Sequence, residues 1–109
     1  QIRMNINLLY LEDPIPFQAS LHQNFPNPFN PSTVIKITSE KISNGVLNVF
    51  CINGSNIVTL YKGTLMPGET SVTWDGKNRQ GEVVANGAYI YALFIDGELI
   101  ESQRMIFIK

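Results

Sequence analysis

The sequence has little charge, one cysteine and one histidine. Of its 109 residues, 8 are Lys or Arg and 9 are Asp or Glu, so the net charge is −1 at neutral pH. This balance offers no electrostatic basis for binding nucleic acid or an anionic membrane. A single cysteine, Cys51, excludes an internal disulfide, and a metal site would have to be built from carboxylates and the lone His22. We therefore expect neither a metal nor another cofactor.

Long hydrophobic runs and helical periodicity are also missing. No apolar stretch approaches the ~20 residues that span a bilayer, and no basic segment followed by an apolar one marks a signal peptide. At 109 residues the chain is long enough for one domain with a sizeable core. Because it begins at Gln1 rather than Met, we expect a piece of a longer protein, whose upstream part would carry any export signal and would be a partner of this domain.

What the sequence does contain is alternation with a period of two. Apolar residues recur at alternate positions in six segments: 34–38, 47–51, 57–61, 72–74, 88–95 and 99–108. Turn residues separate them, mostly Gly paired with Asn, Asp, Lys or Pro. Short strands at such regular spacing predict an all-β fold, an antiparallel sandwich of about seven strands. Asp96-Gly97 and Asn53-Gly54 are predicted to form two-residue hairpin turns, although Ser55 and Asn56 could lengthen the second.

Two segments are apolar on both faces, 88–95 and 105–108. Such a strand either lies centrally in the core or is covered by something outside the domain. Residues 2–11 could supply this cover, or they could be the last strand of a preceding domain. We expect residues 1–20 to be a linker or the tail of a preceding domain, and 21–109 to be the sandwich.

The stretch QNFPNPFNPST, residues 23–33, is the stiffest part of the chain. Pro26, Pro28 and Pro31 fix φ and remove three amide donors, so neither a helix nor a central strand passes through it. We predict that it lies along a sheet edge without offering that edge for pairing, and that Phe25 and Phe29 dock on the sandwich. Asn27 and Asn30, which precede prolines, are held extended. The alternative interpretation is a proline-rich interdomain linker.

The block that begins with Trp74 has a structural interpretation and a metal-binding one. Trp74 would fill the core and Asp75 would hydrogen-bond its own backbone, while Gly76 and Gly81 would supply permissive dihedral angles. Oxygen atoms of Asp75, Asn78 and Glu82 would form the alternative, a calcium loop. Lys77 and Arg79 stand where oxygen ligands belong, which disfavours calcium.

Catalysis finds no support in these residues, because His22 has no acid or nucleophile near it in sequence, and we expect no enzymatic activity. Two other classes stay open. A carbohydrate-binding or adhesion module would display aromatic side chains, for which Tyr61, Tyr89 and Tyr91 are candidates, although inward packing is expected for the last two. A structural or assembly role would make the sandwich a spacer or a subunit contact.

Three motifs together resemble a known family: NPFNPST, the block WDGKNRQGEVVANGAYIYAL (residues 74–93) and the C-terminal RMIFIK. Residues 21–109 are similar to the type A C-terminal sorting domain of the type IX secretion system, and to the immunoglobulin-like domain of the flagellar hook-capping protein. The resemblance implies an immunoglobulin-like sandwich at the end of a larger exported protein, recognised by outer-membrane translocon proteins and destined for the cell surface or the medium. By position in the motifs, it assigns recognition to Gly87, Tyr89, Tyr91, Arg104, Met105, Ile106 and Lys109.

A mechanism follows as a hypothesis from the apolar C-terminal strand. If the edge of this strand is exposed, a receptor can capture it by strand addition, with main-chain hydrogen bonds supplying the affinity.

Overall fold

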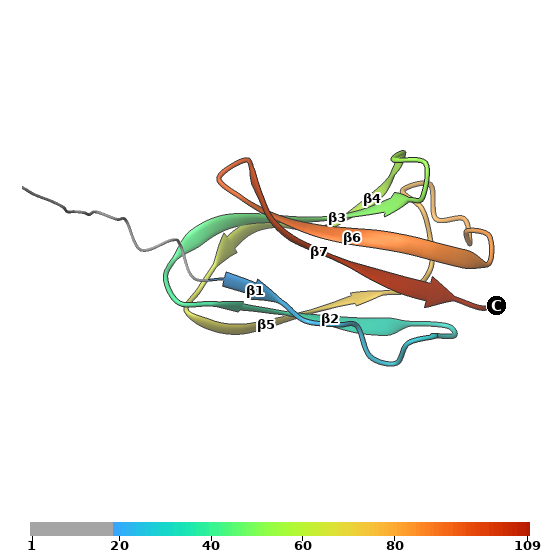
Figure 1. The fold of residues 1–109 in the computed structure, drawn as a ribbon, viewed down its shortest axis with the longest axis horizontal. Helices are drawn as coiled ribbons and strands as arrows, with labels where there is room; N and C mark the ends of the chain where they lie inside the picture. The colour runs from blue at the N-terminus through green and yellow to red at the C-terminus, as the bar shows by residue number, and fades with distance from the viewer. Residues whose placement is uncertain (1–18) are drawn as a thin grey trace, which may run out of the picture.

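A computed structural model describes residues 19–109, which form seven strands and no helix (Figure 1). The strands are β1 (Ala19–Leu21), β2 (Thr33–Ser39), β3 (Ser43–Cys51), β4 (Asn56–Leu65), β5 (Gly68–Trp74), β6 (Gly87–Ile95) and β7 (Glu98–Phe107). This confirms the predicted all-β sandwich. The segment proposed as a cover, residues 2–11, lies outside the described residues. Within residues 19–109, no helix is long and apolar enough to cross a membrane.

Two antiparallel sheets form the layers, in the order β1-β2-β5 and β4-β3-β6-β7. Figure 1 shows them stacked, with β2 and β5 below and β3, β6 and β7 above. Alternation builds the core, since every second residue of β2 from Thr33 to Ser39 is buried and those between are exposed or half-buried. The register follows this pattern and pairs Ile35 with Val72, both in the core.

Strand β6 lies centrally in its sheet, between β3 and β7. Its inner face is buried from Tyr89 to Ile95. On its outer face Ala92 is buried, and Ile90 and Phe94 on either side of it are half-buried. Of the two explanations for a doubly apolar strand, the central position therefore holds for β6. Strand β7, in contrast, ends the sheet, which leaves one of its edges without a neighbouring strand of that sheet.

The two predicted hairpins turn out differently. Asp96 and Gly97 both adopt positive φ, 51° and 84°, as a type I′ turn requires, so this turn is confirmed. At Asn53-Gly54 the two-residue turn is wrong and the longer alternative holds in part: the connection runs over residues 52–55 and includes Ser55, while Asn56 begins β4. The reason is the Asn53 side chain, whose Oδ1 accepts the Ser55 amide at 3.0 Å and the Cys51 thiol at 2.5 Å and so builds the loop itself.

Candidate functional site

The segment Gln23–Pro31, here called the proline strip, follows β1 and is pinned to the sandwich by Phe29. This side chain is 1% exposed and packs between the rings of Trp74 and Phe107, at centroid distances of 5.5 and 5.0 Å. Phe25, which we expected to dock in the same way, is 80% exposed, so that half of the prediction is wrong. The cause is its pairing with Val34, which turns both side chains to the outer face of the small sheet.

The proline strip also occupies the outer edge of the last strand. The Phe29 amide donates to the Ile106 carbonyl at 3.0 Å, and the Ile108 amide donates to the Phe29 carbonyl at 3.2 Å, in a parallel arrangement. Side chains complete the cover: Asn27 Oδ1 accepts the Ile106 amide at 2.9 Å, and Gln23 Nε2 donates to the Arg104 carbonyl at 2.8 Å. Four hydrogen bonds therefore join two segments that lie about eighty positions apart in the sequence.

This arrangement corrects the strand-addition hypothesis. The outward-pointing backbone groups of Ile106, the Arg104 carbonyl and the Ile108 amide already have partners, so a receptor strand could not pair here without displacing the proline strip. The strip was predicted to lie along a sheet edge without offering it for pairing. It does lie there, and its own backbone at Phe29 pairs with the strand.

A buried polar network, which sequence reasoning missed, anchors the start of the proline strip. Asn24 and Thr33 are 2% and 1% exposed, and Asn24 Nδ2 donates to Thr33 Oγ1 at 3.0 Å. The backbone amide of Asn24 donates to the Tyr91 hydroxyl at 2.7 Å, and this hydroxyl donates to the His22 carbonyl, also at 2.7 Å. A signal was present in part, because Thr33 continues the alternation of Ile35 and Ile37 and so had to point inward.

Tyr91 makes this network sensitive to alkaline pH. Burial is the main cause that raises the pKa of Tyr91 from 10.0 to about 12. The hydrogen bond from the Asn24 backbone amide stabilises the phenolate and lowers this pKa, whereas the negative charge of Glu101 raises it. The unfolded chain therefore loses this proton first, and stability is lost as the pH rises from about 10 to about 12, by roughly 1.4 kcal/mol per unit.

The measurement is the free energy of unfolding at pH 9 and pH 11.5 for the natural chain and for Tyr91→Phe. The variant should be less stable at pH 9 by about 1–3 kcal/mol, because the Asn24 amide is left buried without an acceptor. It should also lose less stability between the two pH values. An equal loss in both proteins would contradict the assignment to Tyr91.

The Trp74 block has the structural role predicted for it. Trp74 is 1% exposed and donates from Nε1 to the Lys77 carbonyl at 2.9 Å, while Asp75 Oδ1 accepts the Lys77 amide. Gly76 and Gly81 adopt φ of 75° and 84°. The calcium alternative needed Asn78 as an oxygen ligand, but Asn78 Oδ1 accepts the Gln80 and Glu82 amides, at 2.9 and 3.0 Å. The oxygen of Asn78 is therefore engaged in forming the turn.

The residues assigned to recognition separate into three groups by their exposure. Tyr89, Tyr91 and Met105 are at most 6% exposed, so a partner cannot read these side chains while the sandwich is folded. Gly87 and Ile106 are half-buried, whereas Arg104 and Lys109 are exposed. The Lys109 amide donates to Asn86 Oδ1 at 2.7 Å, which holds the end of the chain against the start of β6. Two basic side chains at the edge of the sandwich are thus the accessible part of the predicted set.

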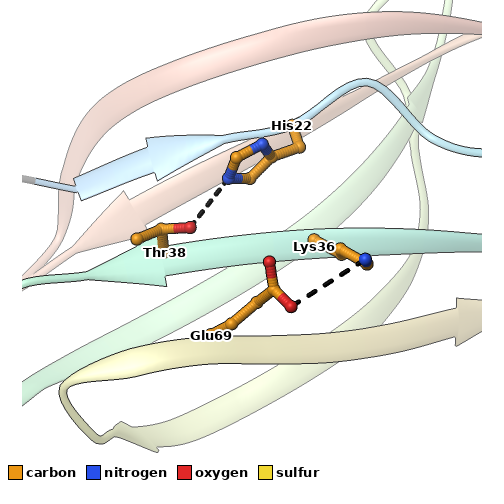
Figure 2. A network of polar contacts seen from close by, with 4 residues as sticks. All are labelled: His22, Lys36, Thr38 and Glu69. Carbon is orange, nitrogen blue, oxygen red and sulfur yellow. Dashed lines mark hydrogen bonds and ion pairs between the residues drawn. The ribbon is translucent and has the colours of Figure 1, made fainter.

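The outer face of the small sheet carries a second group of accessible side chains, at one end of which lies Phe25. His22 Nε2 lies 2.7 Å from Thr38 Oγ1, and Lys36 Nζ lies 3.8 Å from Glu69 Oε1; Figure 2 shows both contacts. A groove of about 490 Å³ is lined by His22, Gln23, Phe25, Val34 and Lys36. Of the tyrosines proposed for glycan stacking, Tyr89 and Tyr91 pack inward as expected, and Tyr61 is half-buried with its hydroxyl donating to the Thr64 carbonyl.

Comparison with known proteins identifies the family to which this chain belongs. Residues 27–93, more than half of the chain, match the sequence profile described as the FlgD Ig-like domain. The chain belongs to the FlgD Ig-like domain family. No curated protein matches it by sequence. The proline strip from Asn27 onward, the Trp74 block and most of β6 lie within the matched region of this FlgD Ig-like domain.

Solved structures show the same fold. FlgD from P. aeruginosa matches with a TM-score of 0.56 and 20% identity over 83% of this chain and 72% of that one. Dimeric latent PorU from Porphyromonas gingivalis matches with a TM-score of 0.73 and 20% identity over 90% of this chain. PorZ from the same organism is described as an essential surface component of the type IX secretion system. It matches with a TM-score of 0.50 and 19% identity over 84% of this chain. This FlgD Ig-like domain spans only about a tenth of the PorU and PorZ chains, 10% and 11%.

Proposed function

We propose that this FlgD Ig-like domain is a non-catalytic C-terminal sorting or anchoring module, which directs a larger exported bacterial protein through type IX secretion to the cell surface or the medium. One observation carries the proposal. The proline strip and the C-terminal strand, two of the motifs behind the resemblance to sorting domains, join through four hydrogen bonds into one continuous surface. The fold shared with PorZ, a surface component of that system, agrees with this role.

Recognition by outer-membrane translocon proteins would use side chains of this surface rather than its backbone. The edge of β7 between Arg104 and Ile108 is occupied by the proline strip, so strand addition is replaced by contacts to the exposed Arg104 and Lys109. Arg104 and Lys109 are both basic and exposed, and an acidic receptor surface would complement their charges. Of the seven residues to which the motifs assign recognition, we therefore propose that Arg104 and Lys109 make the contacts.

The test is export of a reporter fused upstream of this domain, in a host that has type IX secretion. Arg104→Glu combined with Lys109→Glu should lower the exported fraction by about tenfold, which corresponds to about 1.4 kcal/mol of recognition free energy. Both side chains are exposed, so the fold should survive the change. Lys62→Glu with Arg79→Glu is the matched control, because both side chains are exposed and both lie at β4, which β3 and β6 separate from β7: Lys62 belongs to β4, and Arg79 donates to the Asn56 side chain at its start.

A second arm removes residues 104–109, which should abolish export. Since this deletion also takes Met105 and Phe107 out of the core, it tests necessity of the strand but not the role of its charges. Export at full level from the deletion would refute the sorting function. Export at full level from the charge-reversed pair alone would refute the contribution of Arg104 and Lys109.

A carbohydrate-binding or adhesion function is the second candidate, favoured by Phe25. Among the described residues it is the one largely exposed aromatic side chain, and it lines a groove with His22 and Lys36, where a sugar ring could stack and find hydrogen-bonding partners. Polysaccharide pull-down with the natural chain, compared with Phe25→Ala, decides this. Binding that is lost in the variant would favour this function over sorting.

A further inference from the structure

Two segments from opposite ends of the described chain lie side by side and run in the same direction. Residues 21–29 pass along β7, and the bridge between Phe29 and Phe107 is parallel. Figure 1 shows that β1 begins toward one end of the sandwich, whereas the C-terminus lies at the opposite end. A pull on the chain before β1 and on the C-terminus would therefore slide these two segments past each other along their lengths.

Six hydrogen bonds join the two segments within residues 19–109, and we call this set the terminal clamp. Two of them link backbone groups: the Phe29 amide donates to the Ile106 carbonyl at 3.0 Å, and the Ile108 amide donates to the Phe29 carbonyl at 3.2 Å. The other four each use a side chain: Gln23 Nε2 to the Arg104 carbonyl (2.8 Å), the Ile106 amide to Asn27 Oδ1 (2.9 Å), the Leu21 amide to Glu101 Oε1 (2.9 Å) and Gln103 Nε2 to the Leu21 carbonyl (3.1 Å).

Each segment is also anchored in its own sheet. The His22 amide donates to the Lys36 carbonyl at 3.0 Å, and Phe25 and Val34 exchange two backbone hydrogen bonds, which fixes the first segment to β2. Strand β7 pairs with β6 along its whole length. The terminal clamp therefore joins the small sheet to the large one, and force applied to one segment passes through the clamp to the other.

The direction of a pull decides how these bonds share the force. A sliding pull loads the six bonds together, because no bond lies at an end where it can break before the others. A pull that separates two strands sideways breaks their bonds one after another. The Phe29 ring, 1% exposed between Trp74 and Phe107, would have to leave the core in the same step as the clamp bonds. Resistance is therefore greatest between the chain before β1 and the C-terminus.

We propose that this domain is a tension-bearing link, in which the terminal clamp resists force between the chain that precedes β1 and a partner that holds the C-terminal end of β7. Under tension the lifetime of the domain is set by its unfolding rate, and that rate is set by the breaking of the clamp. This mechanical property belongs to the domain itself. It does not depend on the proposed sorting function, and neither experiment below measures export.

The first experiment pulls single molecules of the whole chain in two directions, in a Cys51→Ser background. One pull uses the two chain ends. The other uses the C-terminal end and a thiol introduced by Ala85→Cys, two positions before β6, whose Gly87 pairs with Phe107 near the end of β7. This second pull peels β7 from β6. At equal force the end-to-end pull should unfold the protein at least about tenfold more slowly, because several bonds must break together.

The second experiment removes two bonds of the clamp and leaves the core intact. Gln23→Ala with Asn27→Ala deletes two exposed side chains, so the fold should survive. In the end-to-end pull at constant force, each lost bond should speed unfolding about fivefold, the effect of one ordinary hydrogen bond, and the pair about 25-fold.

Asn56→Ala with Thr59→Ala is the matched control. It also removes two hydrogen bonds between exposed side chains, those that Asn56 accepts from Arg79 and that Thr59 donates to Asn48. Both substitutions lie on β4, which β3 and β6 separate from β7. These bonds are still intact when the clamp breaks, so the control should lower equilibrium stability while leaving the unfolding rate under force unchanged.

Two results would overturn the proposal. One is an equal unfolding rate in the two pulling directions, because the resistance would then not lie between the terminal segments. The other is a Gln23 and Asn27 double variant that unfolds under force no faster than the Asn56 and Thr59 control. The comparison of directions uses no substitution in the clamp, so it decides the question even if the double variant does not fold.

Discussion

Phe29→Ala should lower the free energy of unfolding by about 3–5 kcal/mol, as expected for removing a buried aromatic ring. Phe29 is 1% exposed and contacts Trp74 and Phe107, so its loss leaves a cavity at the junction of the proline strip, β5 and β7. Denaturant unfolding followed by the fluorescence of Trp74, the single tryptophan, measures the change directly because the missing ring lies against the indole.

The matched control is Phe25→Ala, the same substitution four residues earlier in the same strip. Because Phe25 is 80% exposed, its loss should change stability by no more than about 0.5 kcal/mol. Equal effects of the two substitutions would show that Phe29 does not anchor the proline strip. The sequence predicts the same docking for both phenylalanines, so this pair of substitutions tests the difference that tertiary packing makes between them.

Gly76→Ala should cost about 3 kcal/mol, the sum of a left-handed backbone penalty and an overpacking term. Gly76 adopts φ of 75°, and an added Cβ would lie 2.9 Å from two ring atoms of Phe107, closer than carbon atoms approach without a shift. Phe107 cannot move freely because it also contacts Phe29 and Trp74. Thermal or denaturant unfolding measures the loss.

Gly81→Ala separates the two contributions. Gly81 has a similar φ of 84°, but nothing lies within 4 Å of where its Cβ would stand, so only the backbone penalty of about 1–2 kcal/mol should appear. If Gly76→Ala proved no more destabilising than Gly81→Ala, the close approach of this loop to Phe107 would be wrong. Both glycines were assigned the same dihedral role from the sequence.

Much of the fold could be predicted because its causes are local. Alternation with a period of two requires strands, and Asp96-Gly97 requires a type I′ turn, since these two residues tolerate positive φ at adjacent positions. The exclusion of a helix from residues 23–33 followed from three prolines without reference to the rest of the chain. Where a side chain competed locally with the backbone, as Asn53 does, the same reasoning chose the wrong turn.

Other features depend on segments that are distant in the sequence. Nothing local distinguishes Phe25 from Phe29, and the difference arises because one pairs with Val34 while the other meets Phe107 across the sandwich. The same applies to the edge of β7. Its apolar pattern predicted an accessible terminal strand, but the backbone of that strand is satisfied by residues about eighty positions earlier. Composition and periodicity thus dictated which residues form strands and turns, because those preferences act within a few residues. Tertiary packing alone decided which edge is covered and which side chains remain accessible, because hydrogen bonds and ring contacts between distant segments exist only once the two sheets have come together.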